Sequence, residues 1–169
     1  AVDGKPMIVQ VVSSAEQADL EPVIVIEKED SILKKLTGGK YTYVIQPAAT
    51  GPVEAVRLGV EALPADVHEL VIACGDQPFF SAETFRHLAA TVRPGGNEFT
   101  LTNFFIPTGS EWAQYYHHGA QLLRHADMTV REVRPPSKND QTTSGELAHP
   151  IYAAQVPFLR NVLGQIPVQ

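Results

Sequence analysis

Short apolar runs alternate with stretches of helical periodicity through residues 1–95, and this alternation restricts the fold more than any other feature of the chain. The runs are continuous and rich in Val and Ile, and a polar loop follows each of them. Such runs are typical of strands buried on both faces of a parallel sheet, with amphipathic helices as crossovers. The pattern predicts an α/β fold with a mainly parallel central sheet. The predicted strands are Pro22–Ile26, Tyr41–Gln46 and Glu69–Cys74, and the predicted helices are Met7–Ala18, Ser31–Leu36, 53–63 and a segment that begins at Ser81 and buries Phe85 to Val92.

After Gly95-Gly96 the pattern is less regular. Two loops are predicted, a polar one that contains Trp112, Tyr115 and Tyr116, and a second one over residues 135–145, which are rich in Pro, Ser, Thr, Asn and Asp. The remaining elements are strands at Glu98–Ile106, Thr129–Arg134 and Ile151–Ala154, followed by a helix from about Pro157 to Leu163. We expect one domain over residues 1–169, trimmed at both ends.

The composition excludes several classes of protein. Lys and Arg total 13 against 19 Asp and Glu, a formal charge of −6, which disfavours nucleic-acid and anionic-membrane binding. A phosphorylated ligand remains compatible, because a pocket needs only one or two cations and some backbone N–H groups. The single Cys74 cannot form an intramolecular disulfide, and no apolar stretch approaches the roughly 20 residues of a membrane span. These features favour a cytoplasmic protein that acts on small molecules.

An acidic side chain stands directly after a predicted buried strand. Asp76 follows Gly75, whose missing side chain allows another group to come close. In open α/β sheets ligands bind beyond the carboxyl ends of the strands, and Mg²⁺ is commonly held by one or two carboxylates together with substrate phosphates. A turn-forming role for Asp76 before Pro78 is an equally good interpretation of the spacing.

Two further places fit an anionic ligand. Gln46 ends a predicted strand, and Gly51-Pro52 then opens a predicted helix whose free N–H groups suit a phosphate or the edge of a nucleobase. The signal is weak, because every crossover of such a fold has a loop of this kind. Lys5 stands at the start of the first predicted helix, where a cation is unfavourable beside the helix dipole. This misfit favours an anionic ligand there over a simply solvated lysine.

Taken in order, these segments resemble the sugar-nucleotide pyrophosphorylase branch of the nucleotidyltransferases, and most of all its uridylyltransferase domains that make UDP-N-acetylglucosamine. The family's Gly-Lys-Pro-hydrophobic element, its Gln and Gly-Thr-Gly-His-Ala-Val box, and its Gly-Asp-x-Pro and Ser-x-Glu-Thr stretch have counterparts here. Looser counterparts exist for its Pro-Thr-Gly-Tyr-Gly-Arg and Glu-hydrophobic-Asn-x-Gly-Ile-Tyr elements. The matching residues are Gly4–Met7, Gln46 with Gly51–Val56, Val71–Pro78 with Ser81–Thr84, Pro107–Gly109 with Gly119, and Glu146 with Ile151-Tyr152.

The resemblance implies a Rossmann-like three-layer nucleotidyltransferase fold of the GT-A-like kind. It also implies Mg²⁺ as the cofactor, bound by Asp76. The implied reaction is attack of a sugar 1-phosphate on the α-phosphate of an NTP, with UTP expected, and release of pyrophosphate. The implied site residues are Lys5 and Asp76 as catalytic residues, Gln46, Gly51, Pro52 and Gly75 at the nucleotide, and Gly119 and Glu146 at the acceptor substrate.

The sequence also departs from the family, and the departures keep two alternatives open. The strand and Gly-x-Gly-Thr-Arg signature that precede the Lys-Pro element in the family have no counterpart in these residues, so we expect a gap in the central sheet. The sugar-contacting Glu and Asn of the family align with Pro135 and Ala148. The alternatives are a nucleotidylyltransferase with a different acceptor, of the molybdenum-cofactor type, and a non-catalytic module that binds a nucleotide or sugar phosphate.

Overall fold

The structure is a computed structural model that describes residues 1, 3–26, 32–48, 50–107, 109, 111, 119–135 and 145–167. Its contacts divide the chain into two compact units. Unit 1 comprises Ala1–Thr100 and Tyr152–Gln169, and unit 2 comprises Leu101–Ile151. We describe each unit by itself. No helix in the described ranges is both long and apolar enough to cross a membrane.

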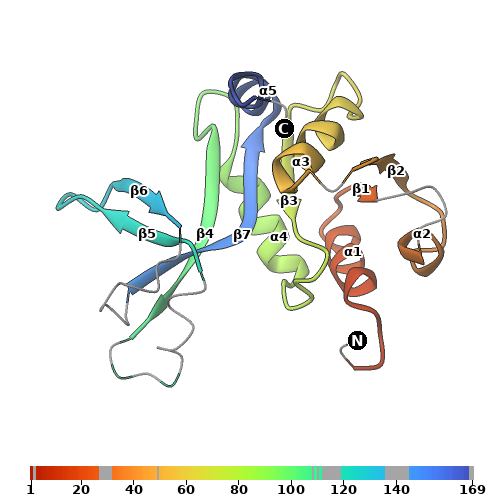
Figure 1. Cartoon of the computed structure of the whole chain (residues 1–169), viewed down its shortest axis with the longest axis horizontal. Coiled ribbons are helices and arrows are strands. Elements are labelled where there is room, and N and C mark those ends of the chain that lie inside the picture. The colour runs from red at the N-terminus through yellow and green to blue at the C-terminus, as the bar shows by residue number, and fades with distance from the viewer. Residues whose placement is uncertain are drawn as a thin grey trace. The chain divides into compact units, whose positions relative to one another are not determined.

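Helices and strands alternate in unit 1, as the apolar pattern predicts (Figure 1). The α/β class is therefore confirmed. In chain order the elements are α1 (Met7–Gln17), β1 (Val23–Ile26), α2 (Ile32–Leu36), β2 (Thr42–Ile45), α3 (Pro52–Glu61), β3 (Glu69–Ala73), α4 (Ala82–Thr91), β4 (Phe99–Ile106), β5 (Gln121–Arg124), β6 (Val130–Arg134), β7 (Gly145–Gln155) and α5 (Val156–Gln165).

The strands form two separate sheets. β1 and β2 pair in parallel, with Val23 opposite Thr42 and Ile26 opposite Ile45. The other sheet has the order β3-β7-β5-β6, with β4 also paired to β7. Among the described residues no strand joins β1 to β3, so the expected gap in the central sheet is confirmed. β1 and β3 each keep one edge without a strand neighbour in these ranges.

Helices α1 and α3 lie against the β1–β2 sheet. Val12 of α1 is buried with Ile24 and Ile26 of β1, and Gly59 of α3 faces Val25 of the same strand. A Cβ at Gly59 would lie 3.5 Å from Val25 Cγ2, an ordinary van der Waals distance, so this position of α3 lies directly over the strand. The amphipathic spacing of both helices thus serves to bury this small sheet.

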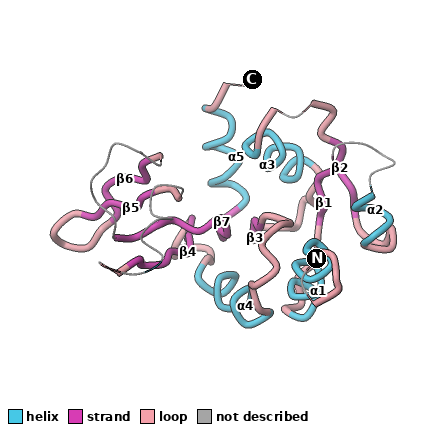
Figure 2. The backbone as a smooth tube through the Cα atoms, turned by 60° about the horizontal axis from the view of Figure 1, so that its bottom comes forward, coloured by secondary structure: helices cyan, strands magenta, loops and turns pink. Residues whose placement is uncertain are grey.

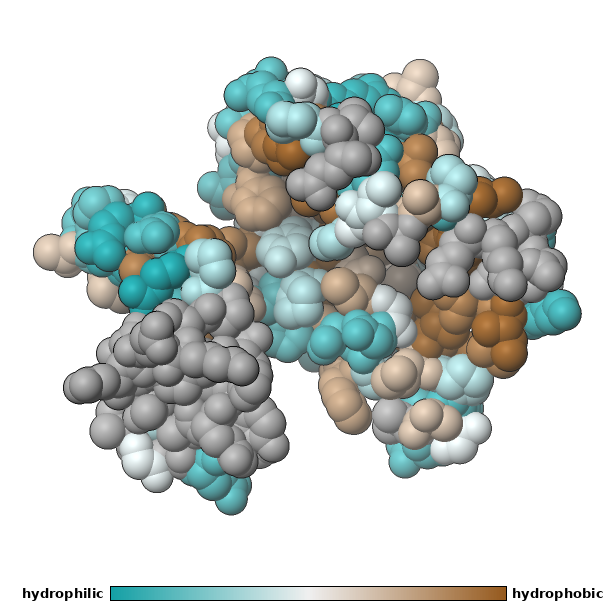
Figure 3. All heavy atoms as spheres, in the orientation of Figure 1, coloured by the Kyte–Doolittle hydropathy of each residue, from teal (hydrophilic) through white to brown (hydrophobic). Residues whose placement is uncertain are grey.

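A second apolar cluster involves α3 and α5, which lie side by side (Figure 2). Val60 of α3 packs with Leu159 and Leu163 of α5, and partly buried residues of β3 complete the cluster. α1 in turn contacts α4, which packs on β3. The core of unit 1 is therefore divided in two at the place where the sheet is interrupted. Several large apolar side chains stay exposed, and apolar patches are visible among polar ones in Figure 3.

Arg57 fastens α3 to the end of α5. Its Nη1 donates to the Leu163 carbonyl oxygen at 2.8 Å and its Nη2 to the Ile166 carbonyl oxygen at 3.0 Å. Its Nε donates to Glu54 at 3.0 Å, which orients the guanidinium. Carbonyl groups at a helix C-terminus lack intrahelical partners, so a cation that donates to them stabilises the helix end.

Replacing Arg57 by methionine is expected to lower the free energy of unfolding by about 1 kcal/mol, because two carbonyl groups lose a charged donor while the apolar stem is kept. Urea unfolding followed by circular dichroism measures the change. Arg57→Lys keeps the charge but not the fork geometry of the guanidinium. We therefore expect its free energy of unfolding to lie between those of the unmodified protein and the methionine variant. Equal stability of the unmodified protein and both variants would show that the hydrogen bonds of Arg57 contribute nothing to stability.

Unit 2 is built mainly from antiparallel strands. β5 lies between β6 and β7, with Gln121 opposite both Arg134 and Leu147. Ile106 of β4 and Leu147 of β7 form its apolar cluster. The parallel pairing that the sequence predicts is thus found in β1–β2, whereas both strand pairs of β5 are antiparallel.

Two predictions for this region need correction. The sequence predicted a loop up to Thr129, but residues 121–124 form β5. Strand β7 begins at Gly145, well before the predicted Ile151. The predicted loop residues Trp112, Tyr115 and Tyr116, and positions 136–144 of the second predicted loop, lie outside the described residues.

Candidate functional site

The start of α1 presents Lys5 to solvent. The helix begins at Met7, after Pro6, whose carbonyl oxygen accepts from the Val9 N–H at 3.1 Å. The first turn of α1 holds no acidic residue, and the N-cap residue makes no side-chain hydrogen bond to the helix. Lys5 is exposed, and the structure gives it no hydrogen bond or ion pair with another described residue. The positive end of the helix and an uncompensated ammonium group thus stand next to each other, which favours an anion.

Ile8 brings this helix start next to the end of β3. A Cβ placed on Gly75 would lie 2.9 Å from Ile8 Cδ1, closer than carbon atoms pack. A side chain at position 75 would therefore require the end of the Ile8 side chain to move, and the first turn of α1 contacts the residue that precedes Asp76. The structure brings together two elements, the Lys5 segment and the Gly75-Asp76 segment, that are separated by about seventy residues in the sequence.

Asp76 is exposed at the end of β3, and its carboxylate makes no hydrogen bond or ion pair with another described residue. No group of three or more His, Cys, Asp or Glu residues among the described residues is arranged to hold a metal. A single carboxylate can be enough for Mg²⁺ when a substrate supplies further ligands. Mg²⁺ keeps several waters and is often held by one or two carboxylates plus substrate phosphates. The donor set fits a metal that is shared with a nucleotide.

Cys74 provides a measurable probe of this carboxylate. Although the residue is exposed, neighbouring atoms desolvate its sulfur, and this burial together with the negative charge of Asp76 raises the pKa of the thiol above its usual value. Both effects disfavour the negatively charged thiolate.

Asp76→Asn is therefore expected to lower the pKa of Cys74, because one of the two causes is removed. The rate of alkylation by iodoacetamide, measured between pH 7 and pH 11, gives that pKa. Asp66→Asn, a change in an exposed loop acid, is the control and leaves the profile unchanged. A profile that is the same in Asp76→Asn and in the unmodified protein would contradict the electrostatic link.

Gln46 and Gly51 lie together at the start of α3. The Gln46 Nε2 donates to the Gly51 carbonyl oxygen at 3.0 Å and to Thr50 Oγ1 at 3.2 Å. Since a carbonyl oxygen only accepts, this bond fixes which end of the amide faces the loop and leaves Gln46 Oε1 as a free acceptor. Gly51 has φ +98°, a conformation that favours glycine, and Pro52 occupies the first position of α3.

The two residues predicted at the acceptor substrate belong to unit 2. Gly119 leaves no room for a side chain, because a Cβ there would lie 2.9 Å from Leu147 Cδ1. Glu146, the next residue before Leu147, accepts from Asn103 Nδ2 at 2.6 Å and from both Nε and Nη2 of Arg124. The hydrogen bonds that Arg124 donates to the Glu146 carboxylate raise the pKa of Arg124. The Glu146 carboxylate is thus already engaged within the sheet, and its contact with substrate stays a prediction.

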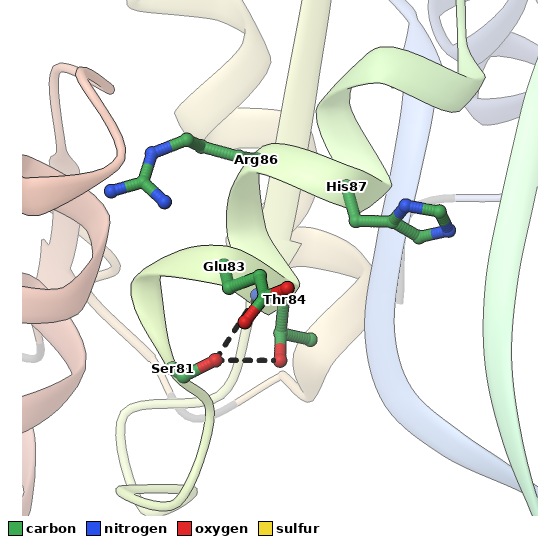
Figure 4. Close-up of a pocket in the computed structure, with 5 residues that line it drawn as sticks. All are labelled: Ser81, Glu83, Thr84, Arg86 and His87. Carbon is green, nitrogen blue, oxygen red and sulfur yellow. Dashed lines mark hydrogen bonds between the residues drawn. The ribbon is translucent and has the colours of Figure 1, made fainter.

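A shallow depression lies on the first turns of α4, lined by Ser81, Glu83, Thr84, Arg86 and His87 (Figure 4). Ser81 caps the helix by accepting from the Thr84 N–H at 3.2 Å. Arg86 is directed away from the cap, and its Nη2 donates to the Gln17 carbonyl oxygen at the end of α1 at 2.7 Å. None of the predicted site residues lines this depression.

Sequence reasoning missed the residues that hold the site residues in place. Ile8, Arg124 and Asn103 carry no motif of their own. In the sequence, Ile8 can be recognised only as one residue of the apolar face of α1. Asn103 can be recognised only as an amide inside an otherwise mainly apolar strand. Their roles depend on contacts between distant segments, which no local pattern contains.

Comparison with known proteins decides the family. The model of the MobA-like NTP transferase domain matches residues 1–134, most of the chain. The chain belongs to the MobA-like NTP transferase domain family. This confirms the resemblance to nucleotidyltransferases, and the members of that class among its relatives are enzymes.

Curated relatives are similar over most of this chain but are much longer than it. The chain is 25% identical to the bifunctional protein GlmU of Streptomyces avermitilis over 174 residues, which covers 96% of the chain and 34% of that protein. It is 29% identical over 138 residues to the GlmU of Bacillus licheniformis, covering 78% of the chain and 30% of that protein. The chain thus spans about a third of the length of these relatives.

Solved structures support the fold. A 4-diphosphocytidyl-2C-methyl-D-erythritol synthase from Anaerococcus prevotii is similar in structure, with a TM-score of 0.62 at 17% identity. The superposition covers all of this chain and 73% of the synthase chain. A CMP:2-keto-3-deoxy-manno-octonic acid synthetase in complex with CTP gives a TM-score of 0.69 at 17% identity, over the whole chain and 70% of its own. The GT-A-like nucleotidyltransferase fold is therefore confirmed.

Proposed function

We propose that this protein is a Mg²⁺-dependent nucleotidyltransferase that joins an NTP, preferentially UTP, to a sugar 1-phosphate and releases pyrophosphate. The observation that carries the proposal is the contact of Ile8 with Gly75. It brings the first turn of α1, which follows Lys5, next to the residue before the exposed Asp76, and this supports a shared role for the two residues. The family match and the GlmU relatives favour the same activity.

In the proposed reaction, each site residue has a role that follows from its chemistry. A phosphate oxygen of the sugar 1-phosphate attacks the α-phosphorus, a new P–O bond forms, and the bond to the pyrophosphate oxygen breaks. Such a step needs in-line positioning and stabilisation of charge on the phosphoryl oxygens more than covalent help from protein. Lys5 and the α1 N-terminus bind and orient the phosphates. Asp76 would hold Mg²⁺, which supplies positive charge to the phosphate oxygens when it is bound.

The loop after β2 is compatible with UTP. Gln46 Oε1 makes no hydrogen bond with another described residue and can accept one from a base; uracil offers its N3–H, and the amino groups of adenine, cytosine and guanine are donors too, so the choice of UTP rests on the GlmU relatives. Exposed N–H groups at the start of α3, with glycine at position 51, leave space for the base edge. Pro52 contributes a fixed backbone conformation there and no N–H of its own.

Release of pyrophosphate from each of the four NTPs with N-acetylglucosamine 1-phosphate tests the proposal. We expect turnover with UTP that needs Mg²⁺ and the sugar phosphate together. A molybdenum-cofactor-type acceptor is the alternative that the sequence left open, so such an acceptor is assayed in parallel with each of the four NTPs. Turnover only with that acceptor would favour the molybdenum-cofactor type, and absence of pyrophosphate with every pair would favour the non-catalytic binding module.

A further inference from the structure

Gln121 is a polar residue inside the sheet of unit 2, and only one end of its amide has a partner. The residue is 0% exposed, on strand β5 between Arg134 and Leu147. Its Oε1 accepts from Arg134 Nε at 2.9 Å and also from Arg134 Nη2. Its Nε2 is buried and has no hydrogen-bond partner among the described residues. Because a guanidinium only donates, the amide oxygen must face Arg134, and the unpaired N–H₂ group points away from it.

An unpaired buried donor is costly and uncommon, so it calls for a specific explanation. The neighbours of Gln121 on this face include Leu147, which is 1% exposed and packs with Ile106. A methionine would fill a similar volume among these side chains without an orphaned donor. The glutamine therefore makes sense where a bound molecule supplies the missing acceptor.

The surroundings of Gln121 connect it to the acceptor substrate. Gly119, predicted at that substrate, precedes Gln121 by two residues and lies just before the start of β5. Arg134 and Leu147, the cross-strand neighbours of Gln121, directly precede Pro135 and Ala148. Neither of these two positions carries a polar side chain, and the nearby Glu146 carboxylate is already engaged by Asn103 and Arg124, whereas the Gln121 N–H₂ group is not engaged.

We infer that Gln121 is a specificity-determining residue whose Nε2 donates to an acceptor-only oxygen, a carbonyl or a carboxylate, on the sugar 1-phosphate. The inference rests on the proposed function. The positive charge of Arg134 on the amide oxygen strengthens the N–H₂ group as a donor and favours an oxygen that carries negative charge. Since Gln121 is 0% exposed, the inference requires that unit 2 opens locally when the substrate binds.

Three probes separate the sources of the oxygen. Glucose 1-phosphate offers hydroxyl groups, N-acetylglucosamine 1-phosphate adds an amide carbonyl, and glucuronic acid 1-phosphate adds a carboxylate. We expect KM for at least one of the last two to be about tenfold or more below that for glucose 1-phosphate, because a site built around a donor rejects a ligand that leaves it unpaired. No such preference in the unmodified protein would overturn the inference.

Gln121→Glu is the decisive variant. It keeps acceptor oxygens for Arg134 and removes only the N–H₂ donor, so the sheet keeps its main contact. KM for the preferred sugar phosphate is expected to rise about tenfold, while KM for the NTP stays unchanged. Gln165→Glu, the same substitution at an exposed position of α5, leaves all of these values unchanged. A Gln121→Glu protein with the preference of the unmodified protein would overturn the inference.

A second readout does not depend on turnover. The side-chain N–H₂ signals of Gln121, identified by their loss in Gln121→Glu, are expected to shift in ¹⁵N spectra with the preferred sugar phosphate and not with glucose 1-phosphate. Signals that stay in place would contradict the contact. Lack of pyrophosphate release with every substrate pair would instead remove the proposed function, so the two failures are distinguishable.

Discussion

Asp76→Asn is expected to reduce the rate of pyrophosphate release by about a hundredfold to a thousandfold, the loss typical when one group that stabilises charge on the reacting phosphate is removed. The amide has the size of the carboxylate but no charge, so it no longer holds a divalent cation well. Initial rates at saturating UTP and N-acetylglucosamine 1-phosphate, over a Mg²⁺ titration, measure the loss. The requirement for Mg²⁺ should move to a higher concentration in the variant.

Stability separates this effect from damage to the fold. Asp76 is exposed and makes no hydrogen bond or ion pair with another described residue, so its replacement is expected to leave the thermal midpoint unchanged. Asp66→Asn is the matched control, an exposed loop acid in the same unit, and keeps full activity. Full activity in Asp76→Asn would exclude Asp76 as the metal ligand and leave its turn-forming role before Pro78 as the better interpretation.

The helices and strands of unit 1 could be predicted because each follows its own period. Helices α1, α3 and α4 bury one stripe, and β1 and β3 are short continuous runs of apolar residues. The helix limits also follow local rules, since Pro52 begins α3 and Ser81 caps α4. Tertiary contacts do not override these signals here, because the patterns agree with the layers in which the elements lie.

Unit 2 could not be predicted equally well, because its strands lack a clear pattern. β5 reads Gln-Leu-Leu-Arg, too short and too mixed to indicate a strand, yet its first residue is completely buried. β7 contains Glu146, His149 and Pro150, which are unusual inside a strand, and only its last part is a continuous apolar run. Glu146 is accommodated because Arg124 and Asn103 surround its carboxylate. That compensation comes from other strands and leaves no local signal.

The sequence was enough to predict which residues are candidates for the site. It was not enough to predict the contacts among them. A glycine followed by aspartate after a strand, and a lysine before a helix, are visible in the sequence. The Ile8 contact that joins them is visible only in three dimensions, as is the bond from Gln46 to Gly51 that decides which amide atom is free for the base. The interrupted sheet is the exception among long-range features, because the family resemblance predicted it.

Gly75→Ala is expected to lower the free energy of unfolding by about 1 kcal/mol or less, because the atom that a Cβ would meet is the end of the Ile8 side chain, which can change its rotamer. The φ angle of Gly75 is not in the left-handed region, so alanine can adopt the backbone conformation, and the whole effect comes from space. Urea unfolding measures the loss. Because Asp76 follows directly, a displaced Gly75 should also lower the rate of pyrophosphate release. Gly164→Ala is the control. A Cβ there meets nothing within 4 Å inside α5, so it should stabilise the protein slightly.

Ile8→Val tests the cause, because it removes the Cδ1 methyl group that a Cβ on Gly75 would meet at 2.9 Å. Alone it should cost about 1 kcal/mol as a lost buried methyl group. Combined with Gly75→Ala it should cost less than the sum of the two single changes, since the new methyl group fills the space that the old one leaves. Strict additivity would mean that the two residues are not in contact. Favourable coupling would instead show that α1 and the end of β3 are fitted to each other, and a single contact would then set the position of Lys5 relative to the segment that carries Asp76.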